Sequence, residues 1–159
     1  MSFRIETIDE KATEYVARHM RQKDHDEVFA CRWNDEVDRL VEDSCWFKEL
    51  AWNAFYKDEP VAALGLSPVR PGVYTCWLYA TDKFDKISIS LTKFAKSVMI
   101  PAMIERHAHR VYCYSMEGHD QAQRWLDHLG VKREHEAKGY GRAGETFFCH
   151  VWRPQHVQS

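Results

Sequence analysis

VYTCWLYA (Val73–Ala80), followed by TDKFDK and then ISISLTKFAKSVMIPAM (Ile87–Met103), is the stretch that decides the fold. The first run is apolar and rich in β-branched and aromatic residues, which predicts a strand. From Ile87 onward, apolar residues recur three, four or seven positions apart, which predicts a long helix with its lysines on the opposite face. RVYCYS (Arg110–Ser115) predicts a second strand. Two strands joined by a crossover helix are expected to be parallel, with a right-handed connection.

The rest of the chain supplies elements around this unit. The charged segment RQKDHDE (Arg21–Glu27) predicts a solvated turn and the start of a helix. The other predicted elements are a strand at Phe3–Ile8, two or three short helices before Cys45, a hairpin of Ala51–Lys57 and Pro60–Leu66, a helix at Gln121–Gly130, and closing strands at Val131–Glu136 and Thr146–Trp152. We therefore expect one α+β domain over residues 1–153 and a frayed tail at 154–159. Its mixed sheet of about seven strands would run from an antiparallel meander into a parallel β-α-β unit, with helices on both faces.

Pro101 falls inside the pattern of the long helix. A proline in a helix removes one backbone hydrogen bond and clashes with the preceding turn. We expect a bend near Ser97, or two helices that meet at Ile100.

Composition excludes several classes of function. The chain has 159 residues, 45% of them hydrophobic, and a formal charge of -2, so it lacks the basic surface typical of nucleic-acid binding. No apolar run is long enough to span a bilayer, and the N-terminus lacks the apolar core of a signal peptide, so we expect a cytoplasmic protein without stable membrane insertion. The five cysteines include no CxxC pair, and the spacing of the nine histidines matches no known ligand set. The sequence therefore predicts reduced thiols and no metal site.

The order and length of the elements resemble the GNAT superfamily of acyl-CoA N-acyltransferases over essentially the whole chain. Four collinear segments also resemble a narrower family, the small, GNAT-like internal virion proteins of short-tailed phages. These segments are HMRQKDHDEV (His19–Val28), AWNAFYKDEPVAALGLSP (Ala51–Pro68), CWLYATDKF (Cys76–Phe84) and QRWLDHLGV (Gln123–Val131).

The GNAT resemblance implies an acetyl-CoA site where the two parallel strands separate. In that family the pantetheine arm pairs with the first strand, and backbone amides of a glycine-containing loop hold the pyrophosphate at a helix N-terminus. The loop here contains no glycine and carries Asp82 and Asp85, which are also typical of helix capping. The residues that would bind acetyl-CoA are Leu78, Tyr79, Ala80, Thr81, Lys83, Lys86 and Ser88.

The resemblance also implies a general acid on the last helix, usually a tyrosine. Aligning Gly130 with the family's glycine puts Leu126 at the tyrosine position and His119 at that of an asparagine. Leucine cannot donate a proton, so this part of the catalytic apparatus is absent from the expected place. Glu117 and His119, just after the second parallel strand, are the candidates for a catalytic base; the alternative is a solvated loop.

Three functions are compatible with a GNAT-like fold that lacks the glycine-containing loop and the usual tyrosine. The first is a phage protein of ejection or morphogenesis that keeps the GNAT fold with a degenerate acyl-CoA site and binds other virion or host proteins. It would be made in the host cytoplasm and packaged in the virion. The second is an active N-acetyltransferase acting on a protein or a small amine. The third is a binding module that uses the cleft for another ligand. The sequence leaves the oligomeric state open.

Overall fold

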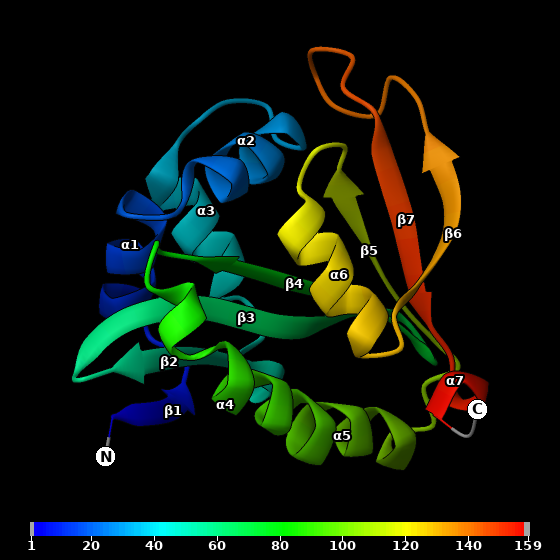
Figure 1. Ribbon diagram of the computed structural model, residues 1–159, viewed down its shortest axis with the longest axis horizontal. Helices are drawn as coiled ribbons and strands as arrows, with labels where there is room; N and C mark the ends of the chain where they lie inside the picture. Colours follow the sequence, from blue (N-terminus) through cyan, green and yellow to red (C-terminus); the bar gives the residue numbers. More distant parts are fainter. Residues whose placement is uncertain (1, 158–159) are drawn as a thin grey trace.

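One mixed sheet forms the centre of the molecule (Figure 1). The structure is a computed structural model that describes residues 2–157. Within them, seven strands lie in the order β1-β2-β3-β4-β5-β7-β6. Their bounds are Phe3–Thr7 (β1), Ala51–Tyr56 (β2), Glu59–Arg70 (β3), Val73–Ala80 (β4), Arg110–Met116 (β5), Lys132–Ala137 (β6) and Phe147–Trp152 (β7). The pair β4–β5 is parallel and the other neighbours are antiparallel, so the predicted meander and crossover unit are confirmed.

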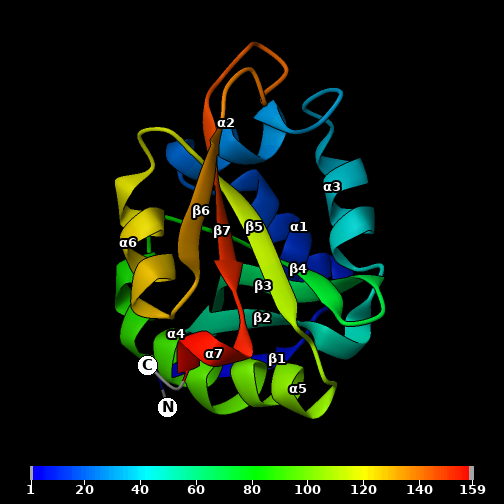
Figure 2. The same ribbon diagram turned by 90° about the vertical axis from the view of Figure 1, so that its right-hand side faces the viewer.

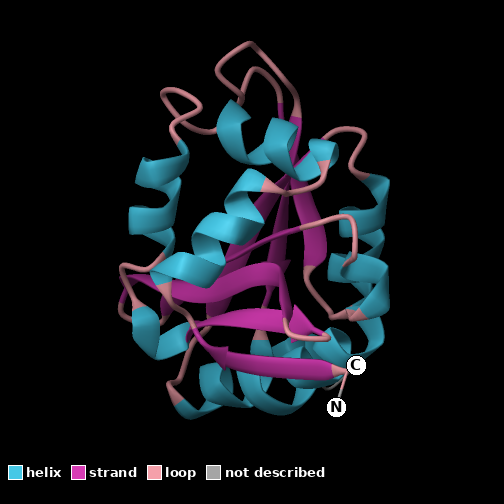
Figure 3. Ribbon diagram, turned by 90° about the vertical axis from the view of Figure 1, so that its left-hand side faces the viewer, coloured by secondary structure: helices cyan, strands magenta, loops and turns pink. Residues whose placement is uncertain are grey.

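Helices cover both faces of the sheet, as predicted (Figure 3). On one face lie α1 (Glu10–Arg18), α2 (Gln22–Ala30) and α3 (Val37–Ser44), whose Val16, Phe29 and Leu40 pack with Tyr79. On the other lie α4 (Ser88–Phe94), α5 (Ile100–Glu105) and α6 (Asp120–His128), which contribute Leu91, Met103 and Leu126 to two further apolar clusters. Alternate residues of β4 therefore enter cores on opposite sides of the sheet.

The parallel pair stays together only at its start. β4 and β5 are in register at Val73 with Arg110, Tyr74 with Val111, and Thr75 with Tyr112. Beyond these positions the two strands diverge, and their far ends separate beneath α2 (Figure 2). The sheet thus opens into a splay between its two halves.

The long crossover helix contains the irregularity expected at Pro101. Residues Ala95–Met99 form a π-helical segment between α4 and α5, and the amide of Ile100 donates to the carbonyl of Ala95. Pro101 lies in the first turn of α5, where a missing amide is tolerated. The helix is therefore irregular before Pro101, as expected, but α4 and α5 do not meet at Ile100, because the π-helical segment Ala95–Met99 joins them.

The C-terminal tail, expected to be frayed over residues 154–159, is described only in part. Pro154–Val157 form one helical turn, α7, and residues 158 and 159 lie outside the described part of the chain. No helix within residues 2–157 has both the length and the apolar character needed to cross a bilayer.

Candidate functional site at the strand splay

A cavity of about 540 Å³ occupies the splay between β4 and β5. Its volume lies within the range typical of small-molecule sites, which is about 300–1,000 Å³. Most of its lining is apolar and comes from β3, both splayed strands, the α4–α5 helix and α6; examples are Leu66, Cys76, Met103, Cys113 and Leu126. The GNAT resemblance predicts the acyl-CoA site at this point, and what the cavity binds stays a prediction.

The open end of the splay is closed by a buried carboxylate of α2. Asp24 Oδ2 accepts hydrogen bonds from the amide of Ala80, at 2.7 Å, and from Arg21 Nη2, at 3.0 Å. Its other oxygen lies 2.8 Å from His119 Nε2. Asp24 therefore joins the last residue of β4 to the loop that follows β5.

Glu27, one helical turn further along α2, makes the matching contact with β5. Its Oε2 accepts a hydrogen bond of 2.8 Å from the amide of Met116, the last residue of that strand. Burial raises the pKa of Glu27, although the nearby His119 partly opposes this shift. The amides at the ends of both splayed strands are thus hydrogen-bonded to carboxylates of α2.

His119 is held inside this network. Its side chain is 4% exposed, and its Nδ1 lies 4.0 Å from Glu27 Oε2, beyond hydrogen-bonding distance. Within the described residues Nδ1 has no hydrogen-bond partner. The guanidinium of Arg21 stacks 4.6 Å over the ring of Phe84 and so connects the network to the loop after β4. Two carboxylates, one imidazole and one guanidinium therefore meet where the strands separate.

The loop expected to hold a pyrophosphate uses several of its amides internally. Phe84–Lys86 form a 3₁₀ turn, with hydrogen bonds from Phe84 N to Thr81 O (3.1 Å), from Lys86 N to Lys83 O (2.9 Å) and from Ile87 N to Phe84 O (3.0 Å). Lys83 Nζ lies 2.9 Å from Glu59 Oε1. A pyrophosphate needs free donors and flexible backbone. Three amides of the loop are thus engaged within it, and its two aspartates add negative charge where a pyrophosphate would lie.

The other predicted binding residues are spread over different surroundings. Leu78 and Tyr79 both line the cavity. The hydroxyl of Tyr79 lies 2.7 Å from Ser44 Oγ, and burial raises the pKa of the tyrosine. The amide of Ala80 is bound by Asp24 as described, and that of Thr81 donates to Val61 O. Lys86 is exposed and Ser88 half-buried at the start of α4.

The two predicted catalytic residues differ sharply in environment. Glu117 is exposed, whereas His119 is buried in the network with Asp24. A catalytic role for either residue stays a prediction. The sequence reasoning missed Asp24 and Glu27 because RQKDHDE was interpreted partly as a solvated turn. Their spacing of three residues, which places both on one helix face, was the available signal.

Comparison with solved structures identifies the fold. A putative acetyltransferase matches with a TM-score of 0.77 at 15% identity, covering 99% of this chain and 88% of that one. The structure of yncA, a putative acetyltransferase from Salmonella typhimurium with its cofactor acetyl-CoA, matches with a TM-score of 0.70 at 10% identity, with coverages of 96% and 94%. A GNAT-family acetyltransferase from Bacillus anthracis matches with a TM-score of 0.70 at 12% identity, with coverages of 98% and 96%.

This protein therefore has the GNAT acetyltransferase fold, as its element order predicted. The sequence matches no family model, and no curated protein matches it significantly. At 10–15% identity, the structural likeness concerns the fold and not the activity.

Proposed function

We propose that this protein uses the GNAT fold as a protein-binding scaffold and has lost acyl-CoA-dependent transfer. The observation that carries the proposal is the pair of α2 carboxylates at the splay. Asp24 and Glu27 accept the amide hydrogens of Ala80 and Met116, the terminal residues of β4 and β5.

Two features of the splay oppose acetyl-CoA binding: the Asp24 contacts and the loop after β4. A pantetheine arm that pairs with β4 near Ala80 would have to displace Asp24, leaving Arg21 and His119 without their buried acceptor. Breaking a buried ionic network in this way is strongly unfavourable. The pyrophosphate would also meet a loop whose amides are partly engaged and whose Lys83 is paired with Glu59.

The more specific role that we propose is that of a virion-associated protein of a short-tailed phage, active in ejection or morphogenesis. It is supported by the resemblance of the four collinear segments. Its partners would be other virion or host proteins, and the protein would be made in the host cytoplasm. Trp33 and Trp46, which are 98% and 73% exposed, offer aromatic contact residues of the kind enriched in protein interfaces.

A second candidate is an active acyl-CoA-dependent N-acetyltransferase. The cavity of about 540 Å³ at the splay favours it, since that is where the fold's cofactor would lie. In this case Lys83 and Lys86 would supply the positive charge for the phosphates. Glu117 or His119 would act as the base toward an amine of a protein or small molecule.

Calorimetric titration with acetyl-CoA separates the two candidates. The scaffold proposal predicts no binding heat for the wild type at acetyl-CoA concentrations up to about 1 mM. A dissociation constant of 1 mM corresponds to a binding free energy of about 4 kcal/mol, so any binding would be weaker than that. Micromolar binding would overturn it, and the Lys83→Glu, Lys86→Glu double variant would then be expected to lose that binding. Lys93→Glu, Lys96→Glu is the matched control, because it changes the charge equally in the helical crossover that follows this loop.

A further inference from the structure

Two cysteines lie at the point where the pairing of β4 and β5 ends. Thr75 opposite Tyr112 is the last pair in register, so Cys76 and Cys113 are the next residue on each strand. Both side chains belong to the apolar cluster that packs beneath α5 and α6. The two thiols therefore lie on the same face of the sheet, on opposite sides of the opening splay.

The two thiols are also close to each other. Cys76 Sγ lies 3.8 Å from the carbonyl oxygen of Tyr112, the residue before Cys113, so this side chain reaches across to β5. A hydrogen-bonding contact with Cys76 is the largest cause of the raised pKa of the Cys113 thiol, and burial adds to it. Neighbouring strands lie about 4.7–4.9 Å apart, and the Cα atoms of a disulfide are usually about 4.4–6.8 Å apart. Opposite residues at the end of the strand pairing thus have the spacing that a disulfide requires.

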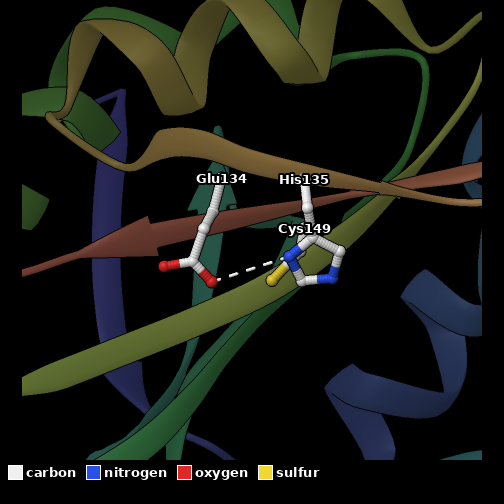
Figure 4. A group of neighbouring side chains, drawn as sticks. All are labelled: Glu134, His135 and Cys149. Carbon is white, nitrogen blue, oxygen red and sulfur yellow. Dashed lines mark ion pairs between the residues drawn. The ribbon is translucent and has the colours of Figure 1, made fainter.

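The other three cysteines lie in different surroundings. Cys149 of β7 pairs with Tyr114, which follows Cys113 in β5, so Cys149 and Cys113 lie on opposite faces of the sheet. Figure 4 shows Cys149 beside Glu134 and His135. The remaining two cysteines follow the ends of α2 and α3. Oxidation that joins the two cysteines of the splay is therefore distinguishable from oxidation of the other thiols.

We propose that Cys76 and Cys113 are a site of reversible oxidation, at which a hydroperoxide joins them in a disulfide that links the two halves of the sheet. Both thiols are half-buried and line the cavity of about 540 Å³, where a molecule as small as hydrogen peroxide can reach them. In the reduced protein both are free.

The oxidation takes two steps. The thiolate of Cys76 attacks one oxygen of the peroxide and breaks the O–O bond, which gives a sulfenic acid and a hydroxide that takes up the thiol proton. The sulfur of Cys113 then attacks the sulfenic sulfur, so the S–S bond forms and water leaves with the second thiol proton. Two thiols thus lose two electrons in total, and one hydrogen peroxide becomes two waters. Cys113 reacts second, because its raised pKa keeps it protonated.

The disulfide acts on the junction between the two halves of the sheet. It adds a covalent link at the first position beyond the paired residues of β4 and β5. It also closes the whole crossover connection into a loop, which lowers the conformational entropy of the unfolded chain. The oxidised protein should therefore unfold at a higher urea concentration than the reduced protein. The inference does not depend on whether acetyl-CoA binds, so it is independent of the function proposed above.

Treatment of the reduced full chain with millimolar hydrogen peroxide tests the proposal. The remaining thiols are alkylated in denaturant, and the protein is digested without reductant for mass spectrometry. We expect linked peptides that contain Cys76 and Cys113 and that a reductant separates, together with a higher midpoint of urea unfolding. Cys76→Ser and Cys113→Ser should each abolish the link and the shift in midpoint. Cys31→Ser, which removes an exposed thiol, is the matched control and should leave both unchanged.

The decisive measurement is made on the wild type, so it holds even if a serine variant fails to fold. Failure to find the linked peptides after peroxide treatment would overturn the proposal, and so would a link from Cys76 or Cys113 to another cysteine. A link that leaves the midpoint of urea unfolding unchanged would show that the bond does not hold the two halves together.

Discussion

Single side chains of α2 hold the two halves of the sheet together. Asp24 provides acceptors for a backbone amide, a guanidinium and an imidazole, and its side chain is 3% exposed. A carboxylate so placed is stabilised only while all of its partners are present. Its removal leaves several buried donors without an acceptor.

Asp24→Ala is therefore expected to lower the free energy of unfolding by about 3–5 kcal/mol. Urea unfolding followed by circular dichroism measures this loss. Asp26→Ala, a change of the same kind on an exposed position of α2, should change stability by no more than about 0.5 kcal/mol. Equal losses in the two variants would show that the buried network does not contribute as described.

The raised pKa of Glu27 makes the stability of the folded protein depend on pH, and its direction determines the sign of this dependence. Because burial raises its pKa above the ordinary value of 4.5, the folded protein holds this proton more tightly than the unfolded chain does. Its contribution to stability is therefore greatest below pH 4.5 and decreases as the pH rises through the shifted pKa. The ionisable groups that face it are Asp24, Arg21 and His119.

Glu27→Gln keeps the shape and an acceptor for the amide of Met116 but cannot ionise. We expect the stability of the variant relative to wild type to improve between pH 4 and pH 7, a range that brackets the ordinary pKa of 4.5. Urea unfolding at both pH values measures the difference. A difference that stays constant, or that changes in the opposite direction, would contradict the raised pKa.

At the scale of elements, the pairing of β3 with β4 depends on a glycine. Gly65 lies opposite Trp77, and a Cβ added to Gly65 would come within 2.7 Å of the indole ring. The ring of Trp77 can lie across β3 because Gly65, its pairing partner, lacks a side chain. Trp77 in turn stacks on Tyr79, so the arrangement of one face of β4 depends on this close approach.

Gly65→Ala is expected to destabilise the protein by about 1–3 kcal/mol through overpacking. The same substitution in a Trp77→Ala background should cost clearly less, because the clashing ring is absent. A double-mutant cycle from urea unfolding measures this coupling. If Gly65→Ala costs the same in both backgrounds, the contact with Trp77 is not the cause.

At the scale of the whole molecule, the strand pairing between β1–β4 and β5–β7 is limited to three residue pairs at the start of β4 and β5. The α2 network and an apolar cluster that contains Leu66 and Val111 also join the two halves. Cys45, at the end of α3, and Cys149, in β7, are buried on opposite sides of this connection.

If the sheet unfolds as one cooperative unit, both buried thiols should become reactive toward a thiol reagent at the same urea concentration. Mass spectrometry of labelled peptides measures each site separately, and the exposed Cys31 serves as the control that reacts without urea. Labelling of Cys149 at a clearly lower urea concentration than Cys45 would instead show that β5–β7 open as a separate unit.

Local pattern alone determined most of the architecture. The period of apolar residues placed the meander, the crossover helix and both parallel strands, and Pro101 predicted an irregularity in that helix. These features follow from interactions between residues close in the chain, which is why the sequence revealed them.

Only the tertiary structure decided what the sites contain. Asp24 meets Ala80 and His119, residues 56 and 95 positions away, so a segment that looked solvated is partly buried. Cys76 and Cys113 meet because of the register in which β4 and β5 pair, and no local periodicity encodes that register. Contacts between distant segments depend on strand register and helix placement, which form only when the whole core packs.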